Sequence, residues 1–164
     1  IAIGTERAAP LDTDNINGTV RLPVGEVVAG TVTVGGQGVG AALLACSNTT
    51  VTVTNSAAFN KTARVTLAVG AEPGGLLLER ADADALTIAE GALLTLNFTA
   101  PAAARPHYAL RWPGNHVATL NSWLDNGTVV IDDTGLGRKA TVFASGAATY
   151  IGLPPSGGTV LMLR

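Results

Sequence analysis

Short runs of β-branched and aliphatic residues recur along the chain, separated by Gly, Asn, Asp and Ser residues. Runs of this length and composition are typical of β-strands joined by tight turns. They recur about every seven to thirteen residues, a rhythm typical of a β-solenoid, a sandwich or a barrel. The runs begin near Thr19, Thr31, Leu43, Val51, Arg64, Leu76, Leu86 and Leu93.

The sequence therefore predicts an all-β fold, either a short right-handed β-solenoid-like domain or a β-sandwich of the jelly-roll type. Aromatic residues make up only 4% of the chain, and Thr, Val, Gly and Ala fill the turns, which favours the solenoid. No residue motif repeats strictly, so the sandwich stays open as the alternative. The 164 residues are predicted to form one domain (1–164), with residues 1–11 as a candidate extended N-terminal arm.

One short helix is predicted near residues 115–125. Asn115 can cap its N-terminus and Gly127 can end it. Trp123 is predicted to be buried as the anchor of this helix on the sheet. The apolar residues at helical spacing are Val117, Leu120, Trp123 and Leu124.

Charge is sparse in this chain. Charged residues are 13% of the total and the net charge is −2, which gives no reason to expect nucleic acid or an anionic membrane as a partner. No apolar run approaches the roughly 18 residues of a membrane-spanning helix, so no membrane span is predicted. A weakly charged, strand-rich chain associates easily.

No catalytic constellation is present in the sequence. A hydrolytic triad, a Walker loop and a metal-ligand spacing are all missing, and the two histidines, His107 and His116, flank Trp112 without further ligands. Asp82 and Asp84 are interpreted as part of a solvated strand edge or turn. The chain is therefore predicted to be no enzyme and to need no cofactor or metal, although a glycosidase-like carboxylate pair assembled by the fold is left open.

Four further segments have plain structural interpretations. Residues 12–18 lack the glycine position of a calcium loop and are interpreted as an Asx-rich turn. The glycine cluster at 35–40 is interpreted as a loop or strand kink. Asp132, Asp133, Arg138 and Lys139 are interpreted as a polar loop. Cys46, the single cysteine, is interpreted as a small buried hydrophobe rather than a reactive thiol.

Two sets of residues are candidates for contact with sugars. Tyr108, Trp112 and Tyr150 are the aromatic residues that a sugar-stacking platform would use, since Trp123 is assigned to the core. Asparagines in the N-x-[ST] pattern are candidate glycan acceptors in an exported chain. These candidate glycosylation sites are Asn17, Asn48, Asn60, Asn97 and Asn126.

Residues 85–99, 108–124 and 127–153 resemble secreted bacterial proteins of the autotransporter-associated β-strand kind. The resemblance covers about three-fifths of the chain and rests on composition and rhythm. It implies an exported, surface-associated β-rich protein of extracellular or cell-surface location. It carries no catalytic motif over to this chain.

The sequence predicts a non-enzymatic, exported structural protein that self-associates, such as a surface fibre whose subunits are joined by β-strand addition. A carbohydrate-binding β module is the first alternative, and a small β-helical polysaccharide-active enzyme is the second. The partners expected are further copies of the chain and glycans. Both terminal segments, residues 1–11 and 159–163, are apolar enough that we expect a neighbouring subunit to cover at least one of them.

Overall fold

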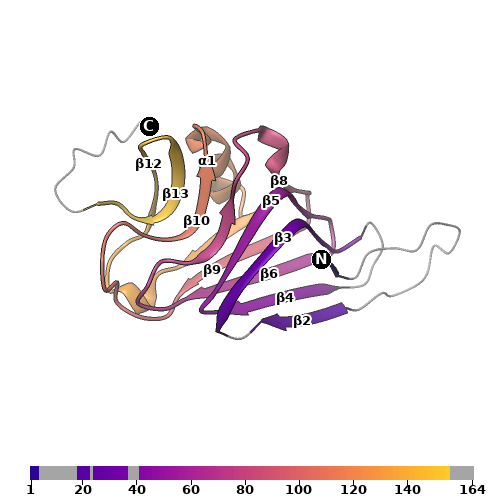
Figure 1. Cartoon of the computed structure of the whole chain (residues 1–164), viewed down its shortest axis with the longest axis horizontal. Coiled ribbons are helices and arrows are strands. Elements are labelled where there is room, and N and C mark those ends of the chain that lie inside the picture. Colours follow the sequence, from indigo (N-terminus) through magenta and orange to yellow (C-terminus); the bar gives the residue numbers. More distant parts are fainter. Residues whose placement is uncertain (4–17, 23, 37–40, 156–164) are drawn as a thin grey trace, which may run out of the picture.

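The computed structural model describes residues 1–3, 18–22, 24–36 and 41–155, which form thirteen strands, one α-helix and two 3₁₀ turns. The strands stack into a β-solenoid of about three turns, which confirms the predicted all-β fold and its solenoid form (Figure 1). Residues 4–17, 37–40 and 156–164, which include most of the predicted N-terminal arm and the predicted strand at 159–163, lie outside the described residues.

Two sheets enclose one core. The first sheet is parallel throughout, in the order β11-β9-β6-β4-β2. Its strands are β2 (Gly18–Leu22), β4 (Ala42–Ser47), β6 (Ala63–Val69), β9 (Leu93–Phe98) and β11 (Val129–Asp132).

The second sheet has the order β1-β3-β5-β7-β10-β13-β12, and β8 also pairs with β5. Its strands are β1 (Ala2–Ile3), β3 (Gly25–Val34), β5 (Thr49–Phe59), β7 (Gly75–Leu78), β8 (Leu86–Ile88), β10 (His107–Pro113), β12 (Thr141–Ser145) and β13 (Ala148–Leu153).

Each coil of the solenoid consists of one strand from each sheet. β2 leads into β3, β4 into β5, and β6 into β7, and each strand pairs in parallel with its counterpart one coil away. Because successive strands of the chain lie in different sheets and pair only with the coils above and below, the connections are crossovers and not hairpins. This pairing pattern distinguishes the solenoid from the jelly-roll alternative.

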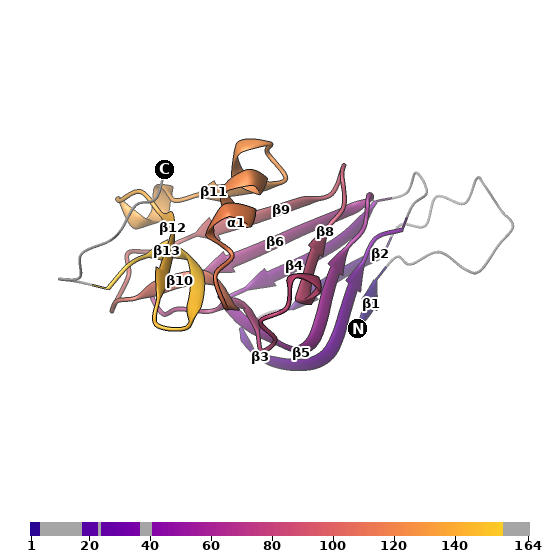
Figure 2. The ribbon, with the colours of Figure 1, turned by 90° about the horizontal axis from the view of Figure 1, so that it is seen from above.

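The last part of the chain departs from this pattern. A two-residue turn at Gly146-Ala147 joins β12 to β13 as an antiparallel hairpin, and β13 inserts between β12 and β10. Since β13 is antiparallel to both neighbours, β12 runs in the same direction as β10 and the earlier strands of that sheet. Figure 2 shows the hairpin beside β10 at the C-terminal end of the stack.

The core is built by strict alternation. In β6, β9 and β4 every second side chain is buried, and aliphatic residues stack coil upon coil between the sheets. Burial of this continuous aliphatic column is the main source of stability for a chain with few aromatic residues. One such column, in strand register, is Leu44, Val65, Leu94 and Val129.

The helix α1 (Val117–Asp125) lies where residues 115–125 predict it, and it is the one α-helix among the described residues. Asn115 Oδ1 accepts a hydrogen bond from the Val117 N–H at 3.4 Å, and Gly127 follows the helix with a left-handed φ of 77°. Leu120 is fully buried, whereas Trp123 is only partly buried. The prediction that Trp123 is buried is therefore wrong, because this short helix turns only Leu120 fully into the core. Trp123 does pack against the core, as the prediction of an anchor requires.

Candidate functional site

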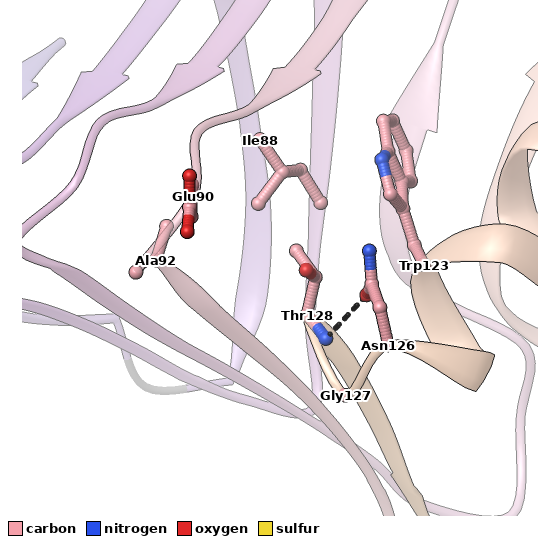
Figure 3. Close-up of a pocket in the computed structure, with 8 residues that line it drawn as sticks. Ile88, Glu90, Ala92, Trp123, Asn126, Gly127 and Thr128 are labelled. Carbon is pink, nitrogen blue, oxygen red and sulfur yellow. Dashed lines mark hydrogen bonds between the residues drawn. The ribbon is translucent and has the colours of Figure 1, made fainter.

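A pocket of about 510 Å³ opens between the C-terminal end of α1 and the turn that joins β8 to β9. It brings together residues about 35 positions apart in the sequence, because the return connections of two successive coils lie side by side. Figure 3 shows its lining residues. The side chains that matter for its chemistry are Ile88, Glu90, Ala92, Trp123, Asn126 and Thr128.

Backbone hydrogen bonds fix both walls of this Trp123 pocket. On the β8–β9 side, the Ala89 N–H donates to the Phe59 carbonyl at 2.8 Å, and the Ala92 N–H closes the turn onto the Ala89 carbonyl at 3.0 Å. The Leu94 N–H donates to the Thr128 carbonyl at 3.0 Å, which ties this wall to the other. The pocket is therefore part of the rigid coil stack.

Trp123 ends a stack of three rings. His116 lies on Trp112 with ring centroids 3.7 Å apart, and Trp112 lies against Trp123 with centroids 6.0 Å apart and planes 13° apart. Trp112 is 1% exposed, whereas Trp123 contributes to the pocket wall. One side of the Trp123 indole is thus supported by the core and the other is available in the pocket.

The polar groups of the pocket sit below and opposite this ring. Asn126 Oδ1 accepts a hydrogen bond from the Thr128 N–H at 3.0 Å, which forms an Asx turn. Figure 3 shows the Asn126 amide nitrogen pointing toward the space between Ile88 and Trp123. Glu90 is exposed and forms no ion pair with the part of the chain that the structure describes. An aromatic wall, an aliphatic wall and a few polar groups are the elements of a site for a small polyhydroxylated ring.

The predicted sugar-stacking residues separate into two groups. Tyr108 and Tyr150 lie together, with ring centroids 5.1 Å apart, on the outer face of the sheet formed by β10, β13 and β12. Phe143 stacks on Tyr150 at 5.2 Å, and Arg111 pairs in register with Tyr150. Trp112 does not belong to this platform: its side chain alternates to the inner face and is buried, so its assignment to a platform is wrong.

The candidate glycosylation sites occupy different environments. Asn48 is exposed at a coil corner with a left-handed φ of 51°, and Asn126 is exposed at the end of α1. Asn60 is partly buried, and its Nδ2 donates to the Gly35 carbonyl at 2.9 Å. Asn97 alternates outward from β9, between Ala68 and Asp132 of the neighbouring strands. Asn17 lies outside the described residues.

Four of the aspartates have structural partners. Arg80 joins Asp82 at 2.7 Å and Asp84 at 3.4 Å in a turn, as the turn interpretation predicts. Asp132 accepts hydrogen bonds from the side chain and the backbone of Thr134, and these bonds lower the pKa of its carboxyl. Asp133 accepts the Ala140 N–H at 2.8 Å, in the polar loop that the sequence predicts.

The two histidines are likewise held by backbone carbonyls. His107 is buried with Nε2 2.8 Å from the Gly70 carbonyl, and His116 Nε2 lies 2.9 Å from the Pro113 carbonyl. Within the described ranges, no group of three His, Cys, Asp or Glu residues is placed to hold a metal ion.

Among the described strands, the unpaired outer edges of the two sheets are a second feature that is open to a binding partner. The outer edge of β3 from Gly25 to Gly30 and that of β2 pair with no other described strand, since β1 covers β3 only at Thr33 and Val34. Two large apolar side chains stand beside this edge, Val24 at 76% exposure and Val28 at 72%. At the opposite end of the stack the edge strands are β11 and β12.

Sequence reasoning missed Trp123 as a surface residue. A usable signal was present: Trp123 precedes the sequon Asn126-Gly127-Thr128 by three residues, one helical turn, at a predicted helix end. That spacing places an aromatic ring beside a glycan acceptor.

Comparison of the chain with protein-family profiles, with curated proteins and with solved structures finds no match. None of the helices that the structure describes has the length and apolarity needed to cross a membrane.

Proposed function

We propose that this chain is a non-enzymatic, exported structural protein of the cell surface that self-associates by β-strand addition. The observation that carries the proposal is the open end of the stack, where β2 and the first half of β3 have no described neighbour on their outer sides. Unpaired strand edges template pairing with another chain, and native proteins normally blunt them with charge or Pro. This edge carries two exposed apolar side chains, Val24 and Val28, beside the exposed charges of Arg21 and Glu26.

Strand direction supports a head-to-tail contact. All five strands of the first sheet run in parallel, so β11 at one end points the same way as β2 at the other. In the second sheet β12 runs in the same direction as β3. A second copy whose β2 pairs with β11, or whose β3 pairs with β12, therefore continues that sheet with the polarity of a further strand, although the second sheet extends one strand further than the first at this end. A contact of this kind is heterologous and propagates.

Side-chain rows support the same arrangement. On the outer face of the second sheet, the row in strand register is Val28, Thr52, Leu77, Arg111, Tyr150 and Phe143. Extension of this row places the exposed Val28 of one copy beside Phe143 of the next; Phe143 is only 3% exposed within its own chain, so Val28 would meet the rim of a ring that already packs on Tyr150. Apolar and aromatic pairs of neighbouring strands stabilise sheets.

The test is a substitution that blunts the edge. Light scattering of the unaltered chain should show growth in mass with concentration, and Val28→Lys should abolish this growth while its circular dichroism and Tm stay unchanged. Val28→Thr keeps a β-branched, uncharged residue and serves as the control that still assembles. A chain that stays monomeric at high concentration, or a Val28→Lys variant that assembles like the parent, contradicts the proposal.

A carbohydrate-binding module is the second candidate, and the paired Tyr108 and Tyr150 rings favour it. Arg111 beside them supplies hydrogen-bond donors for hydroxyl or carboxylate groups of a polysaccharide. If the chain binds polysaccharide, a gel that contains the polysaccharide should retard the parent in affinity electrophoresis. Tyr150→Ala should lose this retardation, and Tyr150→Phe should keep it.

A further inference from the structure

Four of the sequon asparagines lie among the described residues, and Asn126 differs from the other three. The Asn60 amide nitrogen already donates to the Gly35 carbonyl. Asn97 stands in the middle of a sheet between two neighbouring strands, and Asn48 stands at a coil corner. The Asn126 amide nitrogen points into a pocket with an aromatic wall (Figure 3).

The pocket matches the two faces of a pyranose ring. The apolar face of a sugar, formed by its C–H groups, stacks on aromatic rings, and Trp123 offers an indole supported from behind by Trp112. Ile88 provides an aliphatic surface on the other side of the space (Figure 3). Glu90, Asn126 and Thr128 stand around it with acceptor and donor groups for hydroxyls.

We propose that the Trp123 pocket holds one pyranose ring, stacked on Trp123. The ring has two sources, a free saccharide or the first residue of a glycan linked to Asn126. In the linked form, Asn126 Nδ2 bonds to C1 of the sugar as the C1–oxygen bond to a lipid-diphosphate donor breaks. The diphosphate leaves with the bonding electron pair, and a proton from Nδ2 passes to solvent. The site lies away from the Val28 edge on which the test of self-association rests, although Thr128 directly precedes the other edge strand, β11.

The backbone of the sequon is already arranged for the linked form. The Asx turn between Asn126 Oδ1 and the Thr128 N–H engages the amide oxygen and leaves the nitrogen side directed at the pocket. Gly127, between them, has no heavy atom within 4 Å of the place where a Cβ would stand, so the turn itself is not crowded by neighbouring residues. The first sugar would then sit one helical turn from the residue that stacks on it.

The first arm of the test uses the chain made in a host without N-glycosylation. Its two tryptophans give two indole N–H signals in a ¹⁵N-resolved NMR spectrum, one from Trp112 and one from Trp123. Titration with N-acetylglucosamine should shift the Trp123 signal saturably, with a dissociation constant of about millimolar order for one stacked ring, and leave the Trp112 signal in place. Asn126→Ala should weaken binding, and Tyr108→Leu, on the other face, should not.

The second arm uses the chain secreted by a host that adds N-glycans. Glycopeptide mass spectrometry should find Asn126 occupied, and enzymatic removal of the glycan should lower Tm in the parent but not in Trp123→Leu. If the Trp123 NMR signal shifts in the first arm and Tm shows no Trp123-dependent change in the second, the occupant of the pocket is a free saccharide. A Trp123-dependent change of Tm in the second arm identifies the occupant as the sugar linked to Asn126. No saturable shift together with no Trp123-dependent change of Tm overturns the proposal, and light scattering of the same samples reports separately on self-association.

Discussion

His116 stacks on Trp112 with ring centroids 3.7 Å apart and planes 11° apart. The contact is possible because His116 begins α1 directly after the turn that ends β10, and its Nε2 lies 2.9 Å from the Pro113 carbonyl. Trp112 is thus enclosed between a held imidazole and Trp123, and it joins the helix to the sheet. Of the two tryptophans, the buried anchor of α1 is therefore Trp112 on the strand, and Leu120 is the fully buried residue of the helix itself.

This arrangement predicts unequal costs for the two tryptophans. Trp112→Ala removes a fully buried indole and should lower the free energy of unfolding by about 3–5 kcal/mol. Trp123→Ala removes a partly buried ring and should cost about half as much. Urea unfolding of both variants measures the difference, and an equal or reversed order would contradict the assignment of Trp112 as the anchor.

Gly75 and Gly127 have nearly the same backbone conformation, with φ of 80° and 77°, but different surroundings. A methyl group on Gly75 would overlap the Ala109 carbonyl of β10, whereas one on Gly127 would meet open space. Gly127→Ala should therefore cost about 1 kcal/mol for the left-handed conformation alone. Gly75→Ala should cost at least about 3 kcal/mol because it also separates β7 from β10. Thermal unfolding of the two variants measures both losses of stability. The difference between them is the cost of the overlap with the Ala109 carbonyl, because both variants share the cost of the left-handed conformation.

The thiol of Cys46 is buried between the sheets, and burial raises its pKa from 9.0 to about 11. The folded chain therefore keeps its proton at a pH where the unfolded chain has lost it. The contribution of this protonated thiol to the free energy of unfolding is fully present below pH 9 and is lost as pH rises toward 11. Unfolding free energies measured from pH 8 to 11 should fall less steeply for Cys46→Ala, and the native thiol should resist alkylation until the chain unfolds.

Thr149 connects β13 to the start of α1. Its buried hydroxyl accepts the His116 N–H at 2.9 Å and donates to the Gly114 carbonyl at 2.8 Å. Thr149→Val keeps the shape but leaves both backbone groups without this partner, and should cost about 1–3 kcal/mol. Thr149→Ser keeps the hydroxyl and should cost clearly less. Similar losses for both variants on denaturant unfolding would assign the role to packing of the methyl group instead.

Much of the local structure follows from the sequence. Alternation in residues 50–54 and 93–98 identifies the inward side chains, and the turn residues identify the hairpin at Gly146. The helix bounds follow from Asn115 and Gly127. These features depend on neighbours along the chain, so a sequence pattern is enough to predict them.

The stacking of the coils could not be predicted with the same certainty, because its period is irregular. The register offsets between successive strands of the parallel sheet are 24, 21, 29 and 35 residues, since the turns differ in length. A fixed repeat is therefore invisible in the sequence. The burial of Trp112 and the exposure of Trp123 depend on the same long-range arrangement, in which β13 and α1 close over β10.

The coil stack also determines how this chain would respond to force. The strands lie across the stacking axis, and the ladder hydrogen bonds between coils lie roughly along it. A pull along that axis strains the bonds of one coil boundary at a time and peels it open, whereas a pull along the strands shears many bonds together. The 21 residues from Ala42 to Ala63 make the shortest coil, so peeling it would lengthen the chain by about 70 Å, and the longer coils would each give a larger step. Axial stretching should thus show a series of small yielding steps, and loading across the axis should show one abrupt rupture at higher force.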